Sequence, residues 1–221
     1  MFQKFRTFFQ KQNATGALLD FLQHPMPDIN DEYRKASYLV LDLETTGLNP
    51  ENDEIISVGM VTINNWRIRL GDARHILVKP EKSVSQSAIY HGIVDDHLEN
   101  ADPLKYVMPR IFDNLKERIL VVHGASIDVA FLDTACQRLY GVGLSVHYVD
   151  TMALGMRRYR YERQGIPNDA LRLHQLRKLY HLPQYAGHHA LADALATAEL
   201  FLAMAGRIAG RKEMPVKRLL F

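Results

Sequence analysis

The chain has 221 residues, of which 47% are hydrophobic and 24% charged, and its formal net charge is +2. This length and composition suit one α/β domain with a sizeable core, and they exclude a mostly disordered chain. No apolar run is long enough for a transmembrane helix, and the single cysteine, Cys136, excludes an internal disulfide or a cysteine-based zinc site. We therefore expect a cytoplasmic protein without a membrane partner.

The predicted elements begin with an amphipathic helical region at 1–24, followed by a proline-containing linker. Strands are expected at 37–45, 54–63 and 66–80, the third broken at Gly71 and Asp72, and later at 118–124 and 145–151. Helices are expected at 103–117, 126–141, 151–160, 170–180 and 189–206. This order indicates a mixed-sheet α/β domain at 33–208, after a helical extension and linker at 1–32 and before a basic C-terminal tail at 209–221.

The first predicted strand, in YLVLDLETTGL, carries two acids among apolar residues. Because residues two apart in a strand share a face, Asp42 and Glu44 stand side by side, opposite Leu41 and Leu43. Close carboxylates repel one another and burial raises the cost of their charge, so they need protons, cationic partners or a metal. Oxygen ligands suit Mg²⁺ or Mn²⁺, although ion-paired acids at an exposed strand end would give the same pattern.

Two further acids and a histidine lie in comparable settings. Asp128 follows a short strand at the start of a helix, where it could also complement the helix dipole. Asp193 lies close to the small-residue face of the last long helix, where an unpaired acid would be costly, so a cation is expected nearby. His188 is expected on the loop entering that helix, and its imidazole suits proton transfer from water near neutral pH. The alternative is that His188 is a surface or core histidine without a catalytic role.

Together these segments resemble the three motifs of the DEDDh 3′–5′ exonucleases, the DnaQ-like group that includes the epsilon subunit of bacterial DNA polymerase III. LDLETTGL, HGASIDVAFLD and HHALADA match the motifs in order and approximate spacing, and the resemblance covers 37–205. IYHGIVDD is similar to the family's HGI segment, and VDTMALG to its strand-to-helix element. The last motif fits the DEDDh spacing rather than the tyrosine-containing DEDDy pattern, while the second lacks the family's Asn and Phe.

The resemblance implies a ribonuclease H-like fold, with a mixed five-stranded sheet flanked by helices. It implies that Asp42, Glu44, Asp128 and Asp193 bind two Mg²⁺ or Mn²⁺ ions, with His188 as the general base. The implied reaction is hydrolysis of the terminal phosphodiester at a free 3′ end, releasing nucleoside 5′-monophosphates. We favour single-stranded DNA, in replication or repair. The resemblance places Thr45, Thr46, Gly47, Leu48, His91, Gly92 and Ile93 around the terminal nucleotide.

Basic residues are concentrated in two segments. Residues 157–178 hold seven basic and two acidic side chains, and residues 207–218 hold five basic and one acidic. Such segments suit a polyanionic partner, although solvated helix faces produce the same pattern. In RRYRYERQG arginine alternates with tyrosine, so Tyr159 and Arg160 are candidates to contact the backbone and bases of a single strand.

Two alternatives remain open. RNA-trimming DEDDh exoribonucleases of the ribonuclease T or oligoribonuclease type share these motifs, and no feature of the sequence separates DNA from RNA. The chain could instead be chiefly a docking module that binds a DNA polymerase or another protein through its N-terminal helix. Phe2, Phe5, Phe9 and Leu18 would then form an interface rather than part of the core.

Overall fold

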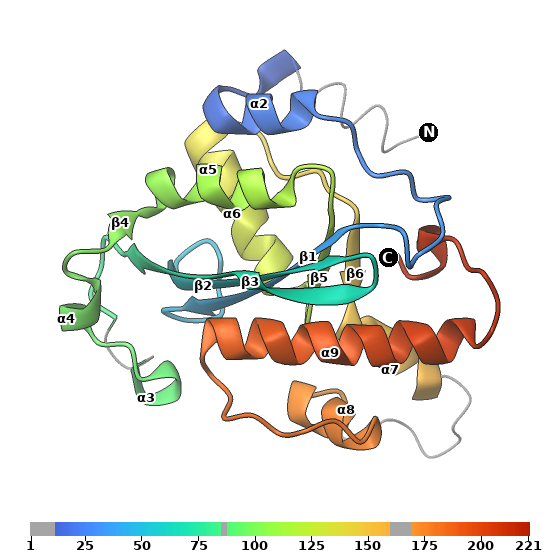
Figure 1. The fold of residues 1–221 in the computed structure, drawn as a ribbon. Coiled ribbons are helices and arrows are strands. Elements are labelled where there is room, and N and C mark those ends of the chain that lie inside the picture. Colours follow the sequence, from blue (N-terminus) through green and yellow to red (C-terminus); the bar gives the residue numbers. More distant parts are fainter. Residues whose placement is uncertain (1–11, 85–87, 160–168) are drawn as a thin grey trace.

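The computed structural model describes residues 12–84, 88–159 and 169–221, which form a three-layer α/β arrangement (Figure 1). Its strands are β1 (Tyr38–Thr45), β2 (Ile55–Asn64), β3 (Arg67–Lys79), β4 (Asp102–Pro103), β5 (Ile119–Val122) and β6 (Tyr148–Asp150). They form one mixed sheet in the order β4-β3-β2-β1-β5-β6. The α/β class is confirmed. The expected number of five strands is wrong by one, because the short β4 pairs in parallel with the end of β3.

Helices cover both faces of this sheet (Figure 1). On one face lie α2 (Gly16–Gln23), α5 (Leu104–Leu115) and α6 (Asp128–Tyr140), and on the other lie α7 (Thr151–Tyr159), α8 (Leu173–Leu179) and α9 (Ala190–Ala209). The short helices α3 (Ala88–His91) and α4 (Asp95–Leu98) follow β3, and a 3₁₀ helix spans Val216–Arg218. In the described ranges no helix is both long and apolar enough to cross a bilayer.

The alternation of side chains along β1 divides the hydrophobic interior into two cores. Leu39, Leu41 and Leu43 belong to the core under α2, α5 and α6. Tyr38 and Val40 point the other way and belong to the core under α9. The two acids of β1 continue this second series, so the strand itself directs them toward the α9 face.

The long strand β3 runs from Arg67 to Lys79 without interruption. The predicted break at Gly71 and Asp72 does not end the strand, but it coincides with an irregularity: Met60 pairs with Arg74 and Thr62 with Arg69, so the register shifts across these two residues. The strands are joined by a tight turn at Asn65 and Trp66, whose φ angles are 51° and 59°. Positive φ at both positions is typical of a two-residue hairpin turn.

Segments that flank the predicted main domain are packed into its cores. In α2, Leu18 is fully buried in the core shared with α5, so the alternative in which it belongs to a docking interface rather than the core does not hold for this residue. Phe2, Phe5 and Phe9 lie outside the described residues. Near the C-terminus Leu219 is also fully buried, in the core under α9.

Candidate active site

Three carboxylates from two elements converge on the α9 face of the sheet. Asp42 and Glu44 come from β1 and Asp193 from the first turn of α9. One oxygen from each lies within 4.8 Å of the others, and all three side chains are partly buried. Of the described residues, no Lys or Arg forms an ion pair with any of them. The cluster therefore has the donor set and the uncompensated charge that suit a divalent cation.

The close approach of α9 to β2 brings Asp193 to the sheet. Gly59 of β2 pairs with Asp42 of β1, and a Cβ added at Gly59 would lie 2.1 Å from the carbonyl carbon and oxygen of Ala190. Only glycine leaves room for the helix backbone at this distance. A glycine in the middle of a strand thus sets the distance between the first turn of α9 and the acids of β1.

The fourth predicted acid, Asp128, lies beside this cluster at the start of α6 and is only 4% exposed. The pairing of β1 with β5 ends at Val40 and Val121, and farther along β1 the N–H of Leu43 donates to Oδ1 of Asp128 at 3.1 Å. Among the described residues, the group of acids within 4.8 Å of one another does not include Asp128. Asp128 is nevertheless close enough to Asp42 for its charge to raise the pKa of that carboxyl.

Burial and mutual repulsion make the cluster resist ionisation. Burial, and then the charges of Asp128, Asp193 and Glu44, raise the pKa of Asp42 well above its usual value. Burial raises the pKa of Asp128 to about 8, against the opposing hydrogen bond from Leu43, and burial and Asp193 raise that of Glu44 to about 7. A bound cation would reverse this preference, since it stabilises the charged carboxylates.

The loop that enters α9 carries His188, as expected from the sequence. Its backbone N–H donates to Oδ2 of Asp193 at 2.7 Å, and its φ of 64° turns the chain into the helix. The next residue, His189, is the N-cap of α9, and its side chain accepts from the N–H of Ala192. The exposed His188 is thus attached through its backbone to one of the converging acids.

The last residue of β1 and the turn after it provide four of the predicted substrate-binding residues. Thr45 donates through Oγ1 to the carbonyl of Gly47 at 2.6 Å, and Thr46 accepts from the N–H of Glu54 at 2.9 Å, so both hydroxyls hold the turn itself. A Cβ on Gly47 would meet the Asp53 carboxylate at 2.4 Å. Leu48 is 77% exposed and remains free to contact a ligand.

The predicted segment at the end of α3 lies near His188. His91 accepts through Nδ1 from the N–H of Ile93, while its buried Nε2 has no hydrogen-bond partner among the described residues. Burial and the charge of His188 lower its pKa. Gly92 has a φ of 69°, and Ile93 packs on the small core around Leu98. Of the remaining candidates, Arg160 lies outside the described residues, as does the side chain of Tyr159.

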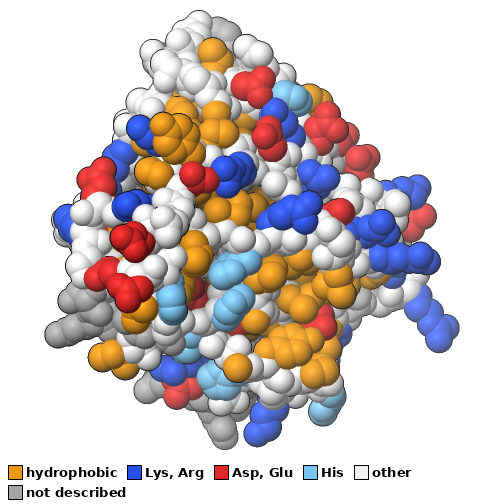
Figure 2. All heavy atoms as spheres, turned by 60° about the vertical axis from the view of Figure 1, so that its left-hand side comes forward, with side chains coloured by type: hydrophobic (Ala, Val, Ile, Leu, Met, Phe, Trp, Pro, Cys, Tyr) orange, Lys and Arg blue, Asp and Glu red, His pale blue; other side chains and the backbone are white. Residues whose placement is uncertain are grey.

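A groove of about 490 Å³ is lined by two of the three acids together with residues of α8 and the loop after it. Its walls include Asp42, His188 and Asp193, and also Arg172, His174 and Tyr185. Figure 2 shows histidine side chains gathered on one face of the molecule, among exposed hydrophobic ones. A larger hollow of about 530 Å³ borders α6 and the ends of β3 and β4, and it includes none of the predicted site residues.

Two features near the site were missed from the sequence. Asp150, at the end of β6, accepts from the backbone N–H groups of Gly124 and Ala125, which fixes the loop before α6, and its charge contributes to the raised pKa of Asp128. An acid at the end of a predicted strand was the available signal. Arg177, one of the cations at 157–178, is 2% exposed and paired with Glu199, so it lies neither on a polyanion-binding surface nor on a solvated helix face.

The model of the RNase_T exonuclease family matches residues 39–201. This match covers most of the 221 residues, so the chain belongs to the exonuclease family. Within that family it is a DnaQ-like DEDDh 3′–5′ exonuclease domain. DEDDh exonucleases generally use divalent metal ions, and the acidic cluster described above is present in this chain.

Curated relatives are much longer proteins. The chain is 33% identical over 174 residues to the PolC-type DNA polymerase III of Thermotoga petrophila, a match that covers 78% of this chain but 12% of the relative. It is 32% identical over 174 residues to the PolC-type DNA polymerase III of Staphylococcus aureus, covering 77% of this chain and 11% of that protein. The chain thus corresponds to a small part of these polymerases.

Solved structures share the fold at low sequence identity. The nuclease domain of 3′hExo, a DEDDh family member bound to rAMP, aligns with a TM-score of 0.66 and 19% identity, covering 84% of this chain and 98% of that one. Exonuclease X in complex with 5′ overhanging duplex DNA aligns with a TM-score of 0.61 and 21% identity, covering 82% and 98%. These alignments confirm the ribonuclease H-like exonuclease fold for this chain.

Proposed function

We propose that this chain removes nucleotides from the 3′ end of DNA and releases nucleoside 5′-monophosphates. The observation that carries the proposal is the convergence of Asp42, Glu44 and Asp193 within 4.8 Å, in a chain of the exonuclease family. The PolC-type relatives are named as DNA polymerases, which favours DNA over RNA and favours the 3′ ends on which a DNA polymerase works. An RNA-trimming activity is the alternative that the experiment below must exclude.

In this proposal Asp42, Glu44, Asp128 and Asp193 hold two divalent cations, Mg²⁺ or Mn²⁺. Such cations, when bound, lower the pKa of an attacking water and stabilise the negative charge on the leaving 3′-oxygen. The acids present suit them, because their oxygens are hard ligands and no described Lys or Arg neutralises the three that converge. Asp128 would complete the ligand set from the side of α6, where Leu43 orients its carboxylate.

His188 would accept the proton of the attacking water. Imidazole is suited to this step near neutral pH, and the backbone of His188 is held against the Asp193 carboxylate at 2.7 Å. His188 lies on an exposed loop and borders the groove together with Asp193, so its ring can reach a water molecule there. The proton transfer itself is expected to contribute about 10²- to 10⁴-fold to the rate.

The terminal nucleotide would lie beside the acids, between the turn after β1 and the end of α3. Thr45, Thr46 and Gly47 shape that turn, and exposed Leu48 offers an apolar surface to a base. The buried Nε2 of His91 would hydrogen-bond to the nucleotide, with Gly92 and Ile93 supporting that segment. Upstream nucleotides would follow the groove past Arg172 and Tyr185, and the proposal extends this path to Tyr159 and Arg160.

The test is a digestion of 5′-labelled single-stranded DNA, duplex DNA with a mismatched 3′ end, and RNA, each with Mg²⁺, Mn²⁺ or EDTA. We expect stepwise shortening of DNA from its 3′ end, with nucleoside 5′-monophosphates as products and no digestion in EDTA. Asp42→Asn and Asp193→Asn should fall below about 1% of the wild-type rate, because each removes a charged metal ligand.

The matched control is Asp96→Asn, which removes an exposed acid of α4 outside the cluster. This variant should digest DNA at the wild-type rate. Digestion that survives EDTA, or that persists in both cluster variants, would contradict the metal assignment. Faster digestion of RNA than of either DNA would favour the exoribonuclease alternative.

A further inference from the structure

Arg177 is a buried cation in the interior between α8 and α9. It lies near the end of α8, and its side chain is 2% exposed. A guanidinium in such a place is costly unless its donors and its charge are matched. Its partners therefore indicate what the residue holds in place.

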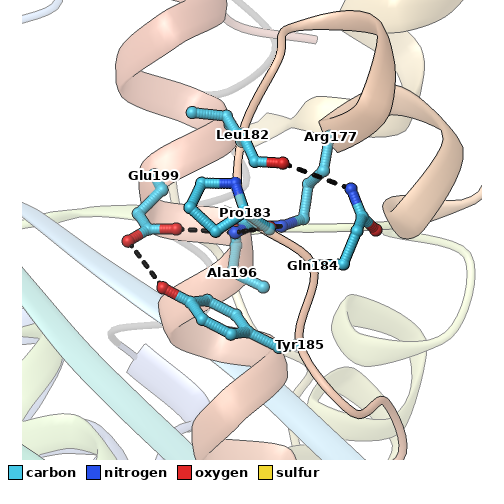
Figure 3. A network of polar contacts seen from close by, with 7 residues as sticks. All are labelled: Arg177, Leu182, Pro183, Gln184, Tyr185, Ala196 and Glu199. Atoms are coloured by element: carbon cyan, nitrogen blue, oxygen red, sulfur yellow. Dashed lines mark hydrogen bonds and ion pairs between the residues drawn. The ribbon is translucent and has the colours of Figure 1, made fainter.

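All the described partners of this guanidinium lie on α9 or on the loop that leads to it (Figure 3). Nε and Nη2 both donate to the carbonyl of Pro183, at 3.1 and 2.6 Å. Nη1 donates to the carbonyl of Ala196 at 2.5 Å, and Nη2 forms an ion pair with Oε2 of Glu199 at 2.7 Å. One planar side chain thus connects the loop at Pro183 to two successive turns of α9.

A second residue of the loop joins the same network. The hydroxyl of Tyr185 donates to Oε1 of Glu199 at 2.9 Å, so the two oxygens of Glu199 bind the loop and the guanidinium separately. The guanidinium carbon of Arg177 also lies 4.6 Å from the centre of the Tyr185 ring (Figure 3). The loop is therefore fixed at Pro183 and again at Tyr185.

This anchored segment leads directly to the site. His188 follows Tyr185 by three residues, and its N–H donates to Asp193, the acid of the first turn of α9. Residues 186–188 therefore run between one attachment at Tyr185 and another at Asp193. The groove beside the acids is lined by Arg177, Tyr185 and His188 alike.

We propose that Arg177, through Glu199 and Tyr185, is a positioning residue that sets where His188 stands beside Asp193. The inference rests on the proposed role of His188 as general base. A buried ion pair adds little to the free energy of unfolding, because apolar side chains of similar size in its place often give a protein of equal stability. Its directed hydrogen bonds instead define one geometry, and displacement of a reacting group by about 1 Å can cost about 10²-fold in rate.

The experiment is a double-mutant cycle of Arg177→Met and His188→Ala, with kcat and KM measured on single-stranded DNA. We expect Arg177→Met to lower kcat about 10- to 100-fold and to change KM less than about threefold. In the His188→Ala background the same substitution should change kcat less than about twofold, because the group it positions is already gone. Arg177→Lys should restore part of the rate, since it keeps the charge but not the planar fork.

Lys178→Met is the matched control, because Lys178 is the exposed neighbouring cation of the same helix. Its kcat should equal that of the wild type, and the loss of one charge from the basic segment at 157–178 should appear only in KM. Amide hydrogen exchange supplies a readout independent of turnover. Arg177→Met should speed the exchange of amides at 184–188, and Lys178→Met should not.

Equal losses of kcat from Arg177→Met in the two backgrounds would overturn the proposal and leave Arg177 a structural residue. Unchanged exchange at 184–188 would also overturn it. If Arg177→Met does not fold, Tyr185→Phe carries the same cycle, because it removes one hydroxyl from a side chain that is 40% exposed. Failure of the proposed function would appear separately, as a wild-type protein that digests no DNA.

Discussion

Asp128 and Glu44 have carboxyl groups whose surroundings oppose their charge. Burial raises the pKa of Asp128 to about 8, and burial together with Asp193 raises that of Glu44 to about 7. Between the ordinary carboxyl pKa and these values, the folded protein binds more protons than the unfolded chain does. Its stability must therefore fall as the pH rises through this window, the reverse of the usual behaviour of ion-paired acids.

We expect the thermal midpoint of the protein in EDTA to decrease as the pH is raised from about 5 to about 8. At pH 8, Asp128→Asn should raise the midpoint by about 2 to 4 °C, because it removes a buried charge but keeps an oxygen for the Leu43 N–H. Added Mg²⁺ should raise the wild-type midpoint most at pH 8, where the acids are ionised. Calorimetry would measure these shifts.

Asp96→Asn again serves as control, because this exposed acid of α4 should leave the pH dependence unchanged. A midpoint that rises steadily from pH 5 to 8 in EDTA would mean that the acids are already compensated in the folded protein. The metal assignment would then lose its electrostatic support.

At the scale of elements, the contact between β2 and α9 decides whether the acids of two elements meet. Gly59→Ala would place a methyl group 2.1 Å from the backbone of Ala190, so the start of α9 must move away from the sheet. We expect a loss of about 10²-fold or more in exonuclease rate and a decrease of about 1 to 3 kcal/mol in the free energy of unfolding. Turnover assays and denaturant titration would measure the two effects.

Gly71→Ala is the matched control, since Gly71 lies in β3 and, apart from its chain neighbours, no described residue has an atom within 4 Å of an added Cβ. It should keep the wild-type rate. If Gly59→Ala keeps the wild-type rate as well, then α9 tolerates displacement and the distance between its first turn and β1 is not decisive.

The sequence predicts the secondary-structure elements better than it predicts the contacts that build the site. Alternation along β1 placed Asp42 and Glu44 on one face, because that pattern is local and depends only on strand geometry. Gly59 inside a strand was a signal of close backbone approach, but nothing local named α9 as its partner. The burial of Arg177 could not be predicted, because it depends on Glu199, 22 residues away, and a cation among other cations gives no sign of that pairing. Both features depend on contacts between residues far apart in the sequence, which residue types alone do not predict.

At the scale of the whole molecule, the segment before β1 and the C-terminal segment join each other through backbone hydrogen bonds. The N–H of Tyr33 donates to the carbonyl of Met214 at 3.0 Å. In the other direction, the N–H of Val216 donates to the carbonyl of Asp31 at 3.0 Å, and that of Lys217 to the carbonyl of Ile29 at 2.8 Å. Arg157 of α7 donates to the carbonyls of Arg218 and Leu220, so this member of the basic segment also binds within the protein. The flanking segments thus close the core on the α9 side.

Leu219→Ala tests this closure without touching the acids. Leu219 is fully buried in the core that also contains Tyr38 and Phe201, so its truncation should lower the free energy of unfolding by about 2 to 5 kcal/mol. Lys212→Ala, at an exposed position of the same segment, should have no measurable effect in the same denaturant titration. Below the unfolding transition, Leu219→Ala should keep the wild-type kcat, because the segment supports the core rather than the site. A loss of kcat in the folded variant would instead connect the closure of this core to the position of α9 and hence of Asp193.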